Sequence, residues 1–187
     1  MRPIVVTEFI TLDGIVDSPG GGDHPHAGWT FKDVQFDEAA YDIKGRETEA
    51  ATALLFGRQS YDEFAPVWPS MEEFETYNAM PKYVVSSTLD GDTAPWGEGQ
   101  VTVLHSLDDV AALKETEGGE IHVHGSARLA QSLAAAGLVD RYTLLVLPLL
   151  LGSGKKLFGE GDKTKLQLVE HAAYGNGIIL QRYDVVR

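Results

Sequence analysis

The stretch Ala53-Leu54-Leu55-Phe56-Gly57-Arg58-Gln59-Ser60-Tyr61 places a short apolar run directly before a glycine and a segment that can form a helix. An apolar run of this length, bounded by glycine, is typical of a buried strand. A turn that leads from such a strand into a helix is typical of α/β proteins. We therefore predict a strand over residues 53–56 that ends at Gly57-Arg58 and enters a short helix reaching Phe64.

The same alternation of strands and helices extends in both directions along the chain. Strands are predicted at residues 4–10, 82–86, 101–104, 120–124 and 141–151, helices at 36–50, 107–114 and 127–136, and a C-terminal hairpin at 166–174 and 177–186. A long glycine-rich loop opens at Pro19 and reaches about Lys32. This order predicts an α/β fold with a mostly parallel central sheet, helices on both faces and an antiparallel edge formed by the C-terminal hairpin.

The composition describes a globular protein with an acidic surface. The chain has 187 residues, 43% of them hydrophobic, and a formal net charge of −13, which together predict one domain over residues 1–187. The absence of cysteine excludes disulfides, cysteine-ligated metals and thiol catalysis. Because an acidic surface repels phosphate backbones and anionic lipids, neither nucleic acid nor membrane is expected as a partner. The first residues show no secretory signal pattern, so we expect a cytoplasmic protein.

Three predicted turns stand at the ends of buried strands: Gly57-Arg58, Ser86-Ser87 and Gly125-Ser126. In open α/β sheets, ligands bind in the crevice at the carboxyl ends of the strands. The first and third turns also open helices, whose free N–H groups favour anions, and Arg58 adds a forked cation suited to phosphate. The turns indicate an anionic ligand such as a dinucleotide, although glycine and serine also end strands and cap helices for structural reasons alone.

The order of these turns resembles the dihydrofolate reductase superfamily, and it is most similar to the branch of the riboflavin biosynthesis reductases (RibD C-terminal domain-like). Five segments in the family's order carry the resemblance: Thr11-Leu12-Asp13-Gly14, Leu55-Phe56-Gly57-Arg58-Gln59-Ser60-Tyr61, Pro81-Lys82-Tyr83-Val84-Val85-Ser86-Ser87-Thr88-Leu89, His124-Gly125-Ser126 and Pro148-Leu149-Leu150-Leu151-Gly152-Ser153-Gly154. Two features depart from the family. His124-Gly125 stands where the family has a glycine pair, and the loop over residues 19–29 is rich in glycine and histidine, which leaves the substrate open.

The resemblance implies NADPH as the cofactor. It implies that the side of the cofactor bearing the 2′-phosphate is held by Gly57, Arg58, Ser60, Ser86 and Ser87. It further implies that the pyrophosphate is contacted by Gly125, Ser126 and Arg128. Asp13 and Gly14 then lie beside the nicotinamide and the substrate.

The activity implied by the resemblance is NADPH-dependent reduction of a small pteridine- or pyrimidine-like heterocycle. It is similar to the reactions of 5-amino-6-(5-phosphoribosylamino)uracil reductase and of dihydrofolate reductase. The alternative is a catalytically idle member of the family that keeps the cleft to bind a nucleotide or a drug-like ring. Both functions need the same turns, so the sequence leaves both open.

A ring nitrogen close to the carbon that accepts hydride needs a proton or a hydrogen bond as charge develops. Asp13 on the loop and Glu38 on the first helix are the leading candidates, Asp37 follows, and Asp42 is also available on the helix. A solvated acidic stripe accounts for the helical residues equally well. An ordered water or His124 is the alternative source of the proton.

Three remaining features have two interpretations each. Trp29 lines the ring pocket or plugs the core. His122 and His124 stand two apart on one predicted strand, which is metal-ligand spacing, but no third ligand is evident and no metal site is expected. The apolar run Leu144–Leu151 exceeds what one strand needs for its own core and indicates a homodimer, unless the strand is buried on both faces within one chain.

Overall fold

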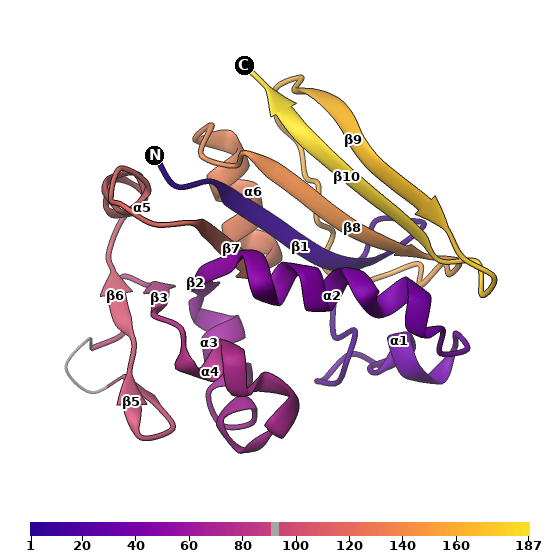
Figure 1. The fold of residues 1–187 in the computed structure, drawn as a ribbon, viewed down its shortest axis with the longest axis horizontal. Coiled ribbons are helices and arrows are strands. Elements are labelled where there is room, and N and C mark those ends of the chain that lie inside the picture. The colour runs from indigo at the N-terminus through magenta and orange to yellow at the C-terminus, as the bar shows by residue number, and fades with distance from the viewer. Residues whose placement is uncertain (91–93) are drawn as a thin grey trace.

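The computed structural model describes residues 1–90 and 94–187, and its centre is a mixed sheet of eight strands. The strand order is β6-β3-β2-β7-β1-β8-β10-β9 (Figure 1). All neighbouring pairs from β6 to β8 are parallel, and β10 pairs antiparallel with both β8 and β9. The predicted α/β fold with an antiparallel C-terminal hairpin is confirmed.

Helices connect most of the parallel strands along the chain as far as β8, whereas β3 and β6 are joined without a helix. The strands of the sheet are β1 (Ile4–Thr11), β2 (Ala51–Gly57), β3 (Lys82–Val85), β6 (Thr102–Leu104), β7 (Glu120–His124), β8 (Arg141–Leu147), β9 (Lys165–Ala173) and β10 (Ile179–Val186). The helices are α1 (Trp29–Lys32), α2 (Glu38–Ala50), α3 (Arg58–Phe64), α4 (Glu75–Ala79), α5 (Leu107–Lys114) and α6 (Ala127–Ala135). The 3₁₀ turns η1 (Trp68–Ser70) and η2 (Glu72–Phe74) precede α4, and β4 (Pro95–Trp96) and β5 (Gly99–Gln100) form a separate two-stranded sheet.

The structure departs from the predicted elements at the end of β8 and in its short elements, which include the unpredicted sheet of β4 and β5. β8 ends at Leu147, whereas the prediction extended to residue 151, because Pro148 follows and has no N–H to continue the ladder. The loop predicted to reach Lys32 contains α1, and the connection between Phe64 and Pro81 contains η1, η2 and α4. α1 and α4 span only four and five residues, so neither is long enough for a periodic pattern to reveal it.

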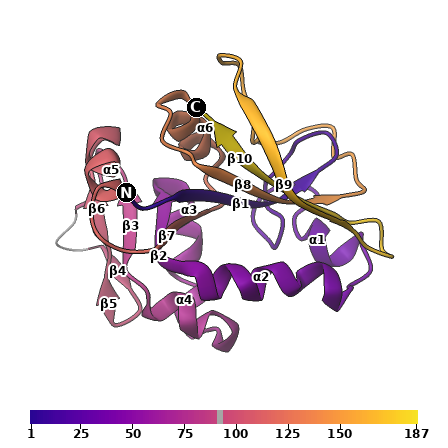
Figure 2. The same cartoon turned by 45° about the horizontal axis from the view of Figure 1, so that its top comes forward.

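The longer helices cover both faces of the sheet (Figure 2). On one face, α6 and α5 pack through Leu133 and Val110 into an apolar cluster that includes Val6 and Leu144. On the other, Ile43 of α2 packs into a cluster that includes Leu145. Because successive strand residues point to opposite faces, the even-numbered residues of β8 face α6 and the odd-numbered ones face α2.

The apolar run Leu144–Leu151 is accounted for within one chain over its first part. Leu144 belongs to the cluster beneath α6, and Leu145 and Leu147 belong to the cluster beneath α2. β8 is therefore buried on both faces, as the alternative to a homodimer expected. Leu150 lies beyond the strand and is 73% exposed. The homodimer stays a prediction.

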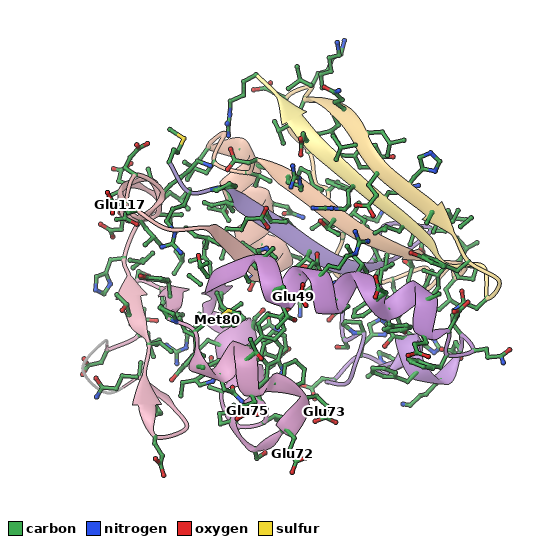
Figure 3. All side chains as sticks on the ribbon, viewed as in Figure 1. Glu49, Glu72, Glu73, Glu75, Met80 and Glu117 are labelled. Carbon is green, nitrogen blue, oxygen red and sulfur yellow. The ribbon has the colours of Figure 1, made fainter. Side chains whose placement is uncertain are left out.

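The acidic character of the sequence is visible on the surface. Glu72, Glu73 and Glu75 lie together on η2 and the start of α4, and Glu49 points outward from α2 (Figure 3). These carboxylates are exposed, so they contribute to the net charge without entering the core. Within the described residues, no helix combines the length and the apolar composition needed to cross a bilayer.

Candidate functional site

β1 and β7 are neighbours in the sheet, but the chain leaves their carboxyl ends toward opposite faces. β1 leads to α2, on the face of Leu145, whereas β7 leads directly to α6, on the face of Leu144. In open α/β sheets, the crevice at such a switch point is where ligands bind. Pairing between the two strands ends at Thr7 and His124, so residues 8–11 of β1 continue with β8 alone. We call this place the β1–β7 crevice.

Two glycine turns meet at the crevice and are joined by one serine. The Ser126 hydroxyl accepts a hydrogen bond from the Gly57 N–H at 2.8 Å and donates one to the Ser60 hydroxyl at 2.7 Å. Gly125 has a φ of +61°, and a Cβ atom at this position would lie 3.1 Å from Ser60 Oγ. Glycine is the residue that best tolerates both the positive φ and the short distance to Ser60. The structure thus brings together Gly57, Ser60, Gly125 and Ser126, four of the residues expected to hold the cofactor.

α6 begins at the crevice with free backbone donors. Its N-cap residue, Ser126, has a φ of 68° and makes no side-chain cap. The first capping bond runs from the Ala130 N–H to the Ser126 carbonyl, and the N–H groups of residues 127–129 have no acceptor in the described part of the chain. Free N–H groups at a helix N-terminus favour an anion. Arg128 adds an exposed guanidinium in the same turn.

The turn Ser86-Ser87 lies beside the turn Gly57-Arg58, because Gly57 and Val85 are partners in the β2–β3 ladder. The Ser86 hydroxyl accepts a hydrogen bond from the Leu89 N–H at 3.1 Å, so it stabilises its own turn. Arg58 Nε donates to both carboxylate oxygens of Asp62 at 2.9 Å. The Arg58 guanidinium, which the sequence analysis expected to bind a phosphate, is therefore paired with Asp62 in this structure. Arg58 and Ser87 are exposed.

Asp13 joins the loop after β1 to the loop after β8. Its carboxylate accepts hydrogen bonds from the Thr11 hydroxyl at 2.5 Å and from the Gly152 N–H at 2.7 Å. The Thr11 hydroxyl and these backbone donors hold the pKa of Asp13 below its usual range, so the group is ionised at neutral pH. Gly14 follows with a φ of +85°. Asp13 is placed as an acceptor that shapes the loop, which makes it a poor proton donor.

The three helical candidates lie at the surface of α2. Asp37 is the N-cap residue, and its side chain accepts a hydrogen bond from the Ala39 N–H at 3.1 Å. Glu38 is exposed, and Asp42 lies 3.4 Å from Arg46 in an exposed ion pair. This arrangement matches the solvated acidic stripe, and it places none of the three carboxylates in a buried pocket.

Trp29 fills the core beneath α2. Its side chain is fully buried, and the indole N–H donates to the Asp17 carbonyl at 2.8 Å. This environment corresponds to the core-plug interpretation, because no face of the ring is open to a ligand.

The sequence analysis missed the buried carboxyl group at the crevice. Glu8 is the first residue of β1 beyond its last pair with β7, and its side chain is 3% exposed. Its Oε1 atom is buried, and the carboxyl group makes no hydrogen bond or ion pair within the described residues. Strand alternation puts Glu8 on the face of Val6 and Ile10, beneath α6. Burial raises the pKa of Glu8 to about 8, although Lys44 opposes the shift.

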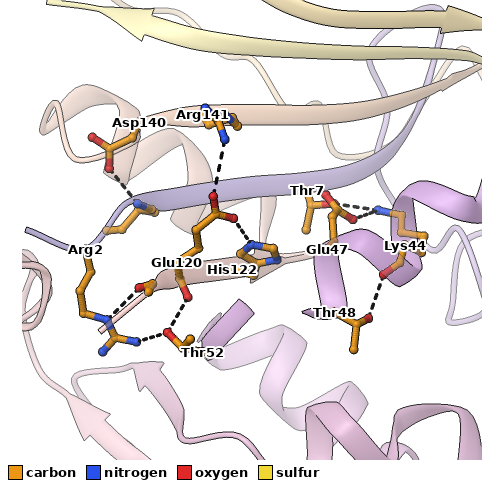
Figure 4. A network of polar contacts seen from close by, with 12 residues as sticks. Arg2, Thr7, Lys44, Glu47, Thr48, Thr52, Glu120, His122, Asp140 and Arg141 are labelled. Carbon is orange, nitrogen blue, oxygen red and sulfur yellow. Dashed lines mark hydrogen bonds and ion pairs between the residues drawn. The ribbon is translucent and has the colours of Figure 1, made fainter. Parts of the chain in front are cut away.

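A row of polar side chains crosses the opposite face of the sheet, beneath α2. Strand register aligns its members on four neighbouring strands: His124, Thr7, Thr143 and Arg182. Lys44 of α2 donates to Thr7 Oγ1 at 2.7 Å and to Glu47 Oε2 at 2.9 Å (Figure 4). Within the described residues, several atoms here are buried without a hydrogen-bond partner: Glu47 Oε1, His124 Nε2, Thr143 Oγ1 and Arg182 Nε. Buried orphan atoms of this kind are usually satisfied by ordered water. We call this set the polar row.

The two histidines of β7 have different surroundings. His122 Nε2 lies 2.8 Å from Glu120 Oε2, and Glu120 also faces Arg141 at 3.5 Å (Figure 4). Burial lowers the pKa of His124 well below its usual value, so that this ring is neutral at pH 7. Among the described residues, no group of three or more His, Asp or Glu side chains is arranged to hold a metal ion.

Two proteins of Bacillus subtilis (strain 168) are similar to this chain in sequence. The uncharacterized protein YyaP is 25% identical over 188 residues, which cover 95% of this chain and 92% of YyaP. The uncharacterized protein YwjB is 26% identical over 138 residues, which cover 71% of this chain and 73% of YwjB. Both similarities run through most of each protein.

Solved structures share the fold at low sequence identity. A candidate riboflavin biosynthesis protein from Shewanella sp. PV-4 superposes with a TM-score of 0.80 at 20% identity, over 100% of both chains. A pyrimidine reductase-like protein from Corynebacterium diphtheriae has a TM-score of 0.67 at 15% identity, over 100% of this chain and 92% of that one. Dihydrofolate reductase from Enterococcus faecalis, complexed with NADP(H) and RAB-propyl, has a TM-score of 0.63 at 15% identity, over 99% of this chain and 97% of that one.

These superpositions confirm the predicted dihydrofolate reductase-like fold. The family model of the RibD C-terminal domain matches residues 2–180, nearly the full length of the sequence. The chain therefore belongs to the RibD C-terminal domain family.

Proposed function

We propose that this protein is an NADPH-dependent reductase of a small heterocyclic compound with a pteridine- or pyrimidine-like ring. The observation that carries the proposal is the β1–β7 crevice, where the free N-terminus of α6 meets two glycine turns joined by Ser126. A dinucleotide needs such a place because its phosphates are anionic and its backbone contacts are close. The chain's net charge of −13 makes local donors necessary for any anionic cofactor.

The residues at the crevice suit the cofactor part by part. The N–H groups of residues 127–129 and the Arg128 guanidinium are available to a pyrophosphate, since neither is occupied by the described part of the chain. Arg58 and Ser87 are exposed at neighbouring strand ends, where they are available to the 2′-phosphate. The dihydrofolate reductase that shares the fold is complexed with NADP(H), which supports the same class of cofactor here.

The nicotinamide of the cofactor, when bound, supplies the hydride. The chain's own contribution is to bind and orient the two rings and to exclude water from them. In this proposal Asp13 positions the loop beside the crevice, because its carboxylate accepts hydrogen bonds from Thr11 and Gly152, and it does not transfer a proton. Asp37 and Glu38 stay candidates for a contact at the outer edge of the substrate, where the N-terminus of α2 begins.

A coupled assay tests the proposal directly. NADPH oxidation is measured by absorbance with a panel of pteridines, pyrimidines and quinones, and thermal unfolding is measured with each ligand alone. A ligand present at 100 times its dissociation constant stabilises the protein by about 2.7 kcal/mol. Turnover of a ring compound supports a reductase. Binding of NADPH and rings without turnover supports the catalytically idle alternative, and no stabilisation by NADPH refutes the cofactor assignment.

Location and assembly belong to the same proposal. The absence of nucleic-acid and membrane partners remains a prediction from the acidic composition. The cytoplasmic location remains a prediction from the first residues, and the small-molecule substrate remains one from the family resemblance. The homodimer also remains a prediction, and its remaining structural support is the exposed Leu150 beyond β8.

A further inference from the structure

Glu8, unlike the buried Glu47, has no cation within ion-pair distance among the described residues. Buried acidic side chains are normally paired with a cation or hydrogen-bonded, because an isolated charge in the interior costs several kcal/mol or more. Glu8 is 3% exposed and makes neither kind of contact in the described residues. It also lies one residue beyond the last pair of β1 with β7, beside the β1–β7 crevice. No described residue occupies its buried Oε1 atom, which is therefore available to a ligand.

Burial, and not the surrounding charge, favours the neutral form of this carboxyl group. Burial raises the pKa of Glu8 to about 8, Lys44 lowers it in part, and Glu47 raises it. Lys44 is already held by Glu47 and Thr7 on the other face of the sheet. His124, at the end of β7, is held neutral by burial and adds no positive charge. At neutral pH the group is thus mostly a carboxylic acid, with one O–H donor and one C=O acceptor.

We propose that Glu8, as a neutral acid, binds an amide edge in the crevice, in which an N–H donor and a C=O acceptor stand side by side. The acid donates its O–H to the amide carbonyl and accepts the amide N–H on its own carbonyl oxygen. This pairing satisfies both oxygens of Glu8 without placing a charge in the interior. An ionised carboxylate loses the donor and cannot make the pair.

Two molecules of the proposed reaction carry this edge, so the inference rests on the proposed function. One is the nicotinamide of the cofactor, through its primary carboxamide. The other is a pyrimidine or pteridine ring, through its lactam. The chemistry is the same in both, and binding experiments with separate probes distinguish the two sources.

Isothermal titration calorimetry at pH 7, 8 and 9 tests the pairing in the intact protein. The probes are NADPH, 2′-phospho-ADP-ribose, which lacks the nicotinamide, and uracil, which presents only the lactam edge. Between pH 7 and pH 9, the fraction of protein in which Glu8 is protonated falls from about nine-tenths to about one-tenth. The affinity for whichever probe pairs with Glu8, NADPH or uracil, should therefore weaken about tenfold. The affinity for 2′-phospho-ADP-ribose, which lacks the amide edge, should not show this tenfold decrease.

Three variants sharpen the test. Glu8→Gln keeps one donor and one acceptor at every pH, so it should bind the amide probe as tightly as the native protein does at pH 7 and lose the dependence on pH. Glu8→Leu should bind about tenfold or more weakly at every pH. Glu49→Gln, on the exposed surface of α2, changes the same functional group elsewhere and should keep the native profile.

The outcomes separate the inference from the function on which it rests. If only the affinity for NADPH depends on pH, the nicotinamide carboxamide is the partner of Glu8. If only the affinity for uracil depends on pH, the lactam is the partner. Either result supports the pairing. Binding of NADPH and uracil that is independent of pH, or a dependence that survives in Glu8→Gln, overturns it. Failure of 2′-phospho-ADP-ribose to bind counts against the proposed cofactor site, whereas uracil still tests Glu8.

Discussion

Replacing Glu8 by Gln should stabilise the protein increasingly as the pH rises. The unfolded chain releases the proton of Glu8 near 4.5, whereas burial holds the native pKa at about 8. Between these values the native state keeps a proton that the unfolded state has lost, so native stability falls with rising pH and levels off above pH 8. Glutamine is neutral throughout and does not contribute this slope.

The size of the effect follows from the pKa difference. One pKa unit corresponds to about 1.4 kcal/mol, so the shift costs the native protein about 3 kcal/mol at pH 7 and about 5 kcal/mol at pH 9, relative to acid conditions. Between pH 5 and pH 9, the stability advantage of Glu8→Gln over the native protein should grow by about 4 kcal/mol. This is a large fraction of the about 5–15 kcal/mol that stabilises a typical domain.

Urea unfolding followed by far-ultraviolet circular dichroism at pH 5, 7 and 9 measures this difference. Other titrating groups, such as His124, act on both proteins and cancel in the comparison. Glu49→Gln serves as the control, because its exposed carboxylate should give the same slope as the native protein. A constant difference between Glu8→Gln and the native protein across this range would show that Glu8 ionises normally, and the reasoning about its burial would be wrong.

The remaining predictions concern the cofactor, the polar row, α2 and assembly. Arg58→Ala should weaken NADPH binding far more than NADH binding, and Asp62→Asn, which frees the Arg58 guanidinium, should strengthen NADPH binding by about fivefold, equivalent to about 1 kcal/mol. Equal changes for both nucleotides in calorimetry would refute this role of Arg58. Lys44→Met leaves the Glu47 carboxylate buried without its cation, so urea unfolding should show a loss of about 3–5 kcal/mol in unfolding free energy. The double variant Lys44→Met with Glu47→Leu should lose less, and equal losses in the two variants would contradict the coupling between these side chains. Asp37→Ala should lower the unfolding free energy by about 1 kcal/mol, whereas Asp37→Asn keeps the N-cap and should change it little. Light scattering should give twice the monomer mass, and a monomer at micromolar concentration would reject the homodimer.

The strands, the longer helices and the glycine and serine turns at the strand ends could be predicted because each depends on local sequence. β2 is a run of apolar residues that stops at Gly57. α5 follows its N-cap residue Ser106, whose hydroxyl accepts a hydrogen bond from the Asp109 N–H at 3.1 Å. The meeting of Gly57 with Ser126 follows from strand order, which places β2 beside β7. Short apolar strands that alternate with helices indicate a parallel sheet, but the order of its strands is known only from the structure.

The buried acid could not be assigned from local pattern alone. Glu8 interrupts an apolar strand, and its neighbours Val6 and Ile10 show that it faces the core. This signal was present in the sequence, but its meaning depends on where β7 stops pairing, which is a tertiary property. The candidate acids at Asp37 and Glu38 looked equally suitable because sequence does not separate a helix cap from a binding group. Burial makes that distinction.

The polar row has a consequence for how water enters the face beneath α2. The same face carries two apolar clusters, one that includes Leu54 and Phe56 and another that includes Leu145 and Ile43. Local opening of the C-terminal half of α2 can expose Lys44 and Glu47 while both clusters stay closed. We therefore expect backbone amides around the polar row to exchange with solvent through local opening of α2 and not through unfolding of the whole domain, which native-state hydrogen exchange would measure.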